Sequence, residues 1–136
     1  MRGDKAFFDT NLIVYAFAKD DPRAEAAEAL LAAGGVISVQ ILNEFAAVAS
    51  RKLGMAWDDV LAALDAILVL CPSPVPLTIE TLRLALGIAK RHKYHIYDAL
   101  VIASALEASC ATLYSEDLQN GQVIGGLTIR NPFQKG

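Results

Sequence analysis

Four acidic residues occupy positions where their carboxylates could act together. Asp9 ends a short apolar segment, and Glu44 lies inside a segment with a helical apolar pattern. Asp98 opens a long apolar segment, and Asp117 follows another short one. If the fold brings these side chains together, they repel one another unless a cation lies between them. Hard divalent ions such as Mg²⁺ and Mn²⁺ prefer such oxygen ligands, and they activate water for phosphodiester hydrolysis.

Each carboxylate also has a purely structural interpretation. Asp9 and Asp98 could cap helices, Asp117 could be an ordinary loop residue, and Glu44 could be an exposed glutamate on a helix. Spacing alone therefore leaves the function open. It also leaves open whether one ion or two, about 4 Å apart, would bind.

The elements that must position these residues alternate between short apolar strands and helical segments. We expect strands over 5–9, 36–39, 111–114 and 127–130, with an edge strand at best over 71–76. We expect helices over 10–17, 22–33, 40–53, 57–68, 79–93 and 97–109, with Asp21 and Thr78 as N-caps and Pro22 as a first helical residue. This alternation predicts parallel pairing and a three-layer αβα sandwich with a central, mainly parallel sheet. Such α/β folds bind ligands at the carboxyl ends of the strands, where Asp9, Glu44 and Asp117 should meet.

Length and composition predict one cytoplasmic domain over residues 1–136. The chain is 54% hydrophobic, but no apolar run approaches the roughly 20 residues of a membrane span, and no export signal is visible. Cys71 and Cys110 lack metal-binding spacing, which predicts reduced core thiols. A net charge of −3 means that any contact with nucleic acid must use a local basic patch.

The dense basic run over 90–95 is the candidate for such a patch. Arg91 and Lys93 could bind phosphates, with Tyr94 or a histidine stacking on an unpaired base. The same cations could instead complement the dipole at a helix C-terminus. Both interpretations can hold at once.

Several motifs together resemble the PIN-domain family over essentially the whole chain. They are Phe8-Asp9-Thr10-Asn11, Asn43-Glu44, Tyr97-Asp98-Ala99-Leu100, the stretch from Leu113 to Leu118, and the ending Asn131-Pro132-Phe133. Within that family the sequence is most similar to the VapC-type toxin ribonucleases of bacterial and archaeal toxin–antitoxin systems. The resemblance implies Mg²⁺- or Mn²⁺-dependent cleavage of RNA, a homodimer, and a cognate antitoxin protein.

The resemblance also implies roles for individual residues. Asp9, Glu44, Asp98 and Asp117 match the family's acidic quartet, as catalytic residues and metal ligands. Thr10, Asn11, Ser115 and Glu116 would orient carboxylates or water. Because Glu116 directly precedes Asp117, either could be the fourth acidic ligand. The alternative function is a PIN-like module that binds RNA or a protein without cleaving.

Overall fold

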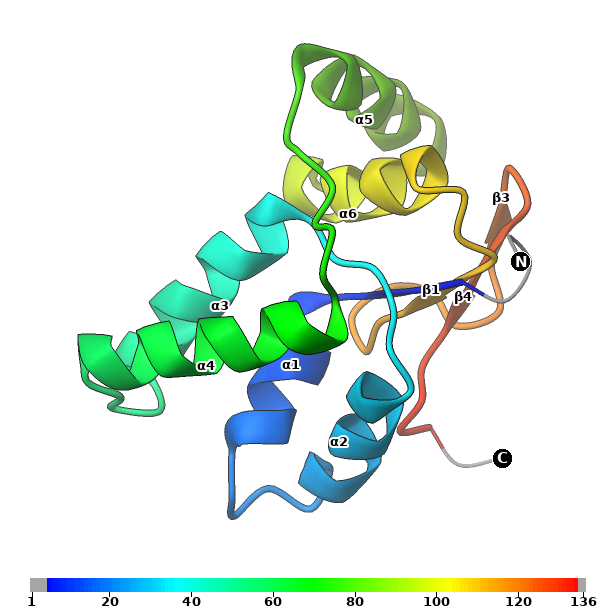
Figure 1. Ribbon diagram of the computed structural model, residues 1–136. Coiled ribbons are helices and arrows are strands. Elements are labelled where there is room, and N and C mark those ends of the chain that lie inside the picture. Colours follow the sequence, from blue (N-terminus) through cyan, green and yellow to red (C-terminus); the bar gives the residue numbers. More distant parts are fainter. Residues whose placement is uncertain (1–4, 135–136) are drawn as a thin grey trace.

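A four-stranded sheet lies at the centre of the computed structural model, which describes residues 5–134 (Figure 1). Its strands are β1 (Ala6–Phe8), β2 (Thr112–Tyr114), β3 (Val123–Ile124) and β4 (Leu127–Arg130). Their order is β1-β2-β4-β3, with β1, β2 and β4 parallel and β3 antiparallel to β4. The prediction of a mainly parallel central sheet is therefore confirmed.

Helices flank this sheet on both sides. They are α1 (Thr10–Phe17), α2 (Ala24–Ala32), α3 (Val39–Arg51), α4 (Trp57–Leu70), α5 (Ile79–His92) and α6 (Ile96–Glu107). In Figure 1, α5 and α6 lie above the sheet, whereas α1 and α2 lie below it. The most buried helix is α6, in which every residue over 99–105 is buried. Asp98 is thus attached directly to the core.

The predicted strand over 36–39 is wrong. Val36 forms only a single bridge to Phe7, and Ser38 forms another to Val75. The reason is local, since the Ser38 hydroxyl accepts a hydrogen bond from the backbone N–H of Ile41 at 3.2 Å and caps α3. This cap begins the helix at Val39 and overrides the β-preference of its branched side chain.

Strand β3 was not predicted, although its sequence carries a hairpin signal. Gly125 and Gly126 form the two-residue loop between β3 and β4, with φ of 55° and 87°. Left-handed backbone at both loop positions suits glycine and allows a tight antiparallel hairpin. The stretch over 71–76 contributes only the bridge at Val75, in keeping with its prolines.

The start of α2 also differs from the prediction. Asp21 is not its N-cap, because α2 begins at Ala24 and the capping position is Arg23, whose side chain makes no capping bond. Asp21 instead accepts hydrogen bonds from the backbone N–H and the guanidinium of Arg23. By contrast, Thr78 caps α5 as predicted, through a 3.1 Å bond from the N–H of Thr81.

Two further expectations concern the whole chain. Cys71 and Cys110 are both buried with free thiols, so both lie in the core as expected. No helix within residues 5–134 combines the length and the apolar character needed to cross a membrane.

Candidate active site

One cavity of about 330 Å³ is lined by all four carboxylates singled out from the sequence. Asp9 follows β1, and Glu44 lies on α3, one turn past its start. Asp98 lies in the first turn of α6, and Asp117 lies in the loop after β2. Four segments that are distant in sequence therefore meet at the carboxyl end of the parallel strands, where α/β folds bind ligands.

The pairing of β1 with β2 fixes the position of Asp9. Phe8 is in register with Tyr114, and the Asp9 N–H donates to the Tyr114 carbonyl at 3.0 Å. Asp9 and Ser115 directly follow this pair of residues, and the Ser115 hydroxyl donates to Asp9 Oδ2 at 2.7 Å. Asp9 Oδ1 accepts from the N–H of Thr10 at 2.7 Å, so Asp9 also caps α1. The capping and cavity-lining interpretations of Asp9 are therefore compatible.

Asp98, by contrast, is not a helix cap. The capping position of α6 is His95, and Asp98 is the third residue of the helix. Its half-buried side chain lines the cavity instead. Its conformation is thus not explained by the capping interpretation.

Hydroxyl and amide groups hold the other two carboxylates. The Thr10 hydroxyl donates to Glu44 Oε1 at 2.6 Å, and the Asn11 amide donates to Asp117 Oδ2 at 2.7 Å. Ser115 Oγ also accepts from the backbone N–H of Asp117 at 3.2 Å. The structure thus places Thr10, Asn11 and Ser115 in contact with carboxylates of the cavity, where their expected orienting role requires them.

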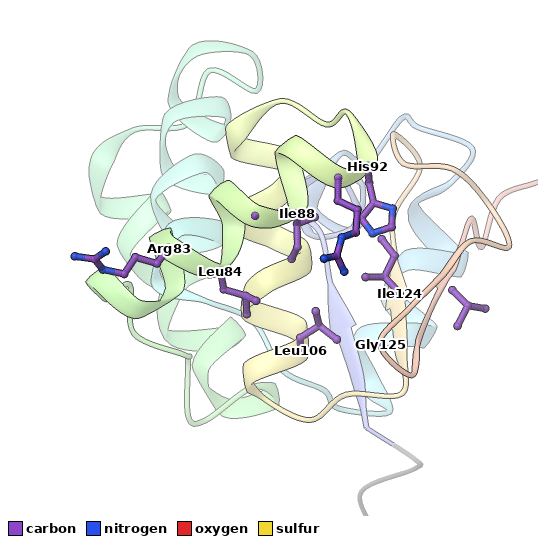
Figure 2. A pocket seen from close by; sticks show the side chains of 10 residues that line it. Arg83, Leu84, Ile88, His92, Leu106, Ile124 and Gly125 are labelled. Carbon is purple, nitrogen blue, oxygen red and sulfur yellow. The ribbon is translucent and has the colours of Figure 1, made fainter.

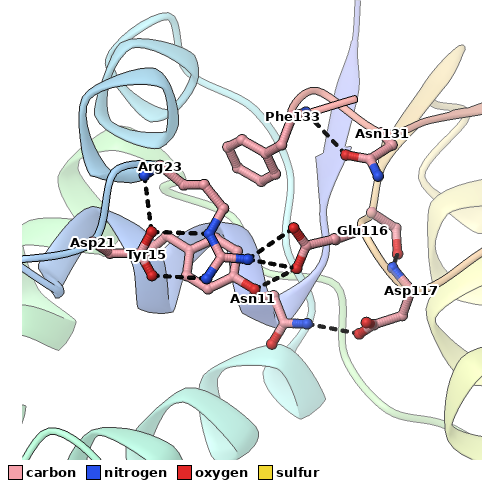
Figure 3. A network of polar contacts seen from close by, with 9 residues as sticks. Asn11, Tyr15, Asp21, Arg23, Glu116, Asp117, Asn131 and Phe133 are labelled. Atoms are coloured by element: carbon pink, nitrogen blue, oxygen red, sulfur yellow. Dashed lines mark hydrogen bonds and ion pairs between the residues drawn. The ribbon is translucent and has the colours of Figure 1, made fainter. Parts of the chain in front are cut away.

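Glu116 points away from these carboxylates. Its carboxylate accepts two hydrogen bonds from Arg23 Nη1, at 3.0 and 2.9 Å, and another from the Tyr15 hydroxyl (Figure 3). Figure 3 shows the adjacent Asp117 directed instead toward Asn11. Between the two acidic residues that the sequence left open, Asp117 lines the cavity and Glu116 does not.

A cluster of side chains around Arg23 holds the loop that carries Asp117. Arg23 pairs with Asp21 at 2.8 Å and with Glu116 at 2.9 Å, and its guanidinium lies 3.7 Å from the centre of the Tyr15 ring. Tyr15 in turn packs edge-on against Phe133, with ring centres 5.5 Å apart. These contacts connect α1 and the start of α2 to the loop after β2. Sequence analysis missed this cluster.

Burial and mutual repulsion make the cavity a costly place for negative charge. The pKa of Asp9 is raised to about 6, chiefly by burial and also by the charges of Asp117 and Glu44, against the lowering effect of its bonds from Ser115 and Thr10. Burial also raises the pKa of Asp98, with contributions from Asp117 and Glu44 and an opposing one from His95. A bound cation would relieve both effects.

The donor chemistry of the cavity fits a hard divalent cation, because carboxylate, hydroxyl and amide oxygens surround it. The four carboxylates line the cavity but do not form a closed set of metal ligands. Within residues 5–134, no three histidine, cysteine, aspartate or glutamate side chains are grouped so that they could hold a metal ion. A metal-binding role for these carboxylates therefore stays a prediction.

The two cations predicted to bind substrate lie elsewhere. Arg91 lines a different cavity of about 520 Å³, together with Arg83 and His92 (Figure 2). Lys93 is the residue that ends α5, with left-handed φ of 60°. Neither lines the carboxylate cavity, whereas Arg51, which sequence analysis missed, does. The overlooked signal is its spacing of seven residues from Glu44, which places both on one helix face.

The parallel sheet and the acidic cavity at the carboxyl ends of its strands place the protein among the α/β proteins that bind ligands at that edge of the sheet. Within that class the assignment is specific, because the family model described as "PIN domain" matches residues 6–122. The chain belongs to the PIN-domain family.

Solved structures with the same fold include toxins of toxin–antitoxin systems. VapC20 of Mycobacterium tuberculosis, described as a toxin that cleaves the sarcin–ricin loop, is 22% identical with a TM-score of 0.69, over 83% of this chain and 90% of that one. A toxin–antitoxin complex from Klebsiella pneumoniae contains a chain 16% identical with a TM-score of 0.72, over 96% and 100%. A chain of VapBC2 from Rickettsia felis, bound to a promoter DNA fragment, is 19% identical with a TM-score of 0.68, over 93% of this chain and 97% of that one. No curated protein matches the sequence.

Proposed function

We propose that this protein is an endoribonuclease that hydrolyses RNA phosphodiester bonds with Mg²⁺ or Mn²⁺. The observation that carries the proposal is the convergence of Asp9, Glu44, Asp98 and Asp117 on one cavity of a PIN-family fold. These side chains would hold the cation. When bound, a divalent ion would withdraw charge from the phosphate and lower the pKa of water, so that hydroxide is available to attack near neutral pH.

The remaining residues of the site orient the carboxylates. Ser115 and the N–H of Thr10 each donate to one oxygen of the buried Asp9 carboxylate and so orient it. The Thr10 hydroxyl holds Glu44, and Asn11 holds Asp117, in the same way. Such partners position ligands and reduce the reorganisation that substrate binding requires.

We further propose that the protein is the toxin of a toxin–antitoxin pair, inhibited by a cognate antitoxin, and that it forms a homodimer. One of the similar structures is described as a toxin–antitoxin complex, another as VapBC2 bound to promoter DNA, and a third as a toxin that cleaves the sarcin–ricin loop. This chain spans 90% or more of each of those chains. Co-expression with the product of the neighbouring reading frame should suppress the nuclease activity. Full activity in a stable co-purified complex would contradict the antitoxin assignment.

A cleavage assay with analysis of the product ends tests the activity. We expect water to attack the phosphorus and the P–O3′ bond to break, with a proton passing to the 3′ oxygen. No ribose 2′-hydroxyl is then needed, and the products carry a 5′-phosphate and a 3′-hydroxyl. Excess chelator should abolish cleavage, and Mn²⁺ or Mg²⁺ should restore it. Products ending in 2′,3′-cyclic phosphate, or full activity in chelator, would contradict the mechanism.

A non-cleaving PIN-like module that binds RNA or a protein is the second candidate function. The observation that favours it is that no closed set of three metal-binding side chains exists within residues 5–134. The same assay decides, because a binding module would retain RNA without metal-dependent turnover.

A further inference from the structure

A cation and an aromatic ring line the carboxylate cavity without belonging to the acidic set. Arg51 is the last residue of α3, and Tyr97 lies in the first turn of α6. Both side chains are exposed, and Tyr97 retains 61% of its accessible surface. They therefore border the cavity on the solvent side, where a substrate enters.

Helical spacing shows that Arg51 faces the cavity. The cavity-lining residues of α3 are Glu44, Ala47, Val48 and Arg51. These positions follow the i, i+3, i+4, i+7 pattern of a single helix face. Two turns separate Glu44 from Arg51, about 10 Å along the axis. Arg51 is thus placed for a phosphate that neighbours the cleaved one, rather than for Glu44 itself.

The charge of Arg51 is available for such a phosphate. In the described part of the chain, the ion pairs are those of Arg23 with Asp21 and Glu116. Arg51 thus lines the same cavity as the four acidic residues without forming one of the ion pairs described within residues 5–134. A guanidinium suits phosphate well, because it offers several N–H donors in one plane.

Tyr97 offers a ring to a base. It directly precedes Asp98, so a nucleotide held at the carboxylates brings its neighbouring base within reach of the ring. An aromatic face stacks on any base, but only on one that is unpaired and turned out of a helix. This feature favours single-stranded RNA over duplex RNA as the substrate.

We infer that Arg51 and Tyr97 hold single-stranded RNA across the carboxylate cavity, Arg51 on a backbone phosphate and Tyr97 on an unpaired base. The inference rests on the proposed function and assigns substrate-binding residues at the same site. It also assigns substrate binding to different residues from Arg91 and Lys93. Arg51 could alternatively serve only to complement the dipole at the end of α3, and the test separates these roles.

Binding of a short labelled single-stranded RNA, followed by fluorescence anisotropy in Mg²⁺, tests the inference. The parent is Asp98→Asn, in which cleavage should be at least about a hundredfold slower than in the wild type. Arg51→Ala should raise Kd about tenfold and reduce the slope of log K against log salt by about 0.7. Tyr97→Ala should also raise Kd about tenfold, whereas Tyr97→Phe, which keeps the ring, should bind like the parent.

Matched controls give the result its meaning. Lys52→Ala removes a cation from the same end of α3, but Lys52 lines another cavity, so RNA binding should not change. A duplex of the same sequence should show no effect of Tyr97→Ala. Parental affinity and salt slope in both Arg51→Ala and Tyr97→Ala would overturn the inference, as would equal losses in Lys52→Ala.

The chain with its natural carboxylates separates this inference from the proposed function. If it cleaves RNA and the rate at limiting RNA is unaffected by Arg51→Ala and Tyr97→Ala, the inference alone fails. If it never cleaves RNA but binding depends on both residues as described, the nuclease proposal fails and the single-strand site stands.

Discussion

Replacing Asp9 with asparagine should stabilise the metal-free protein at neutral pH. The Asp9 carboxylate is buried, and its pKa is raised from 3.8 to about 6, chiefly by burial and further by Asp117 and Glu44. This difference corresponds to about 3 kcal/mol of unfolding free energy at pH well above 6. Asparagine carries no charge there and keeps an oxygen that can accept from the N–H of Thr10.

The sign of the pH dependence follows from the direction of the pKa change. A carboxyl group whose pKa is higher in the folded state binds more protons there than in the unfolded chain. Its contribution to stability is fully present below pH 3.8 and is lost as pH rises through about 6. The stability of Asp9→Asn minus that of the wild type should therefore grow between these values and then level off.

Urea unfolding in chelator, followed by circular dichroism from pH 4 to pH 8, measures this difference. Asp65→Asn is the matched control, because Asp65 is exposed on α4 outside the cavity. Addition of Mg²⁺ at pH 7.5 should raise the melting temperature of the wild type but not that of Asp9→Asn. A stability difference that is flat across the pH range would refute the electrostatic reasoning.

Three other predictions concern the loop after β2, the basic run and the oligomer. Asp117→Asn should lower RNA cleavage by at least about a hundredfold, because Asp117 lines the cavity. Glu116→Gln should instead act mainly by lowering the free energy of unfolding by about 1–3 kcal/mol, because it weakens the bonds to Arg23. Equal losses of activity in both variants at unchanged stability would contradict this. Arg91→Ala with Lys93→Ala should weaken RNA binding and flatten its salt dependence if these cations also contact phosphate, and unchanged binding and slope would leave only the helix-end role. Sedimentation at micromolar concentration should show a dimer, and a monomer would contradict the proposed association.

Much of the fold could be predicted because apolar patterning and capping are local properties. The strand that precedes Asp9 and the helix capped by Thr78 are specified by residues within a few positions of each other. The segment at Val36 could not be resolved in this way. Its β-branched residues favour a strand, but the cap at Ser38 and the bridge to Val75 determine the backbone.

The candidate site was harder to predict where direction matters more than position. Glu116 and Asp117 are adjacent, and only the partner Arg23, 93 residues before Glu116, shows which carboxylate turns away from the cavity. Arg51 was predictable in principle, because its helical spacing from Glu44 places it on the same face. The basic run around Arg91 drew attention by composition alone, which says nothing about the cavity it lines.

The rate of RNA cleavage by Asp98→Asn, measured against Mg²⁺ concentration, tests the shared carboxylate site most directly. Asp98 does not cap α6, and asparagine removes a charge whose burial is costly, so the metal-free variant should be at least as stable as the wild type. Its cleavage should nevertheless fall by at least about a hundredfold at every Mg²⁺ concentration, because a metal ligand is missing, while the exposed control Asp65→Asn keeps the wild-type rate. Wild-type cleavage with wild-type metal dependence in Asp98→Asn would contradict the account.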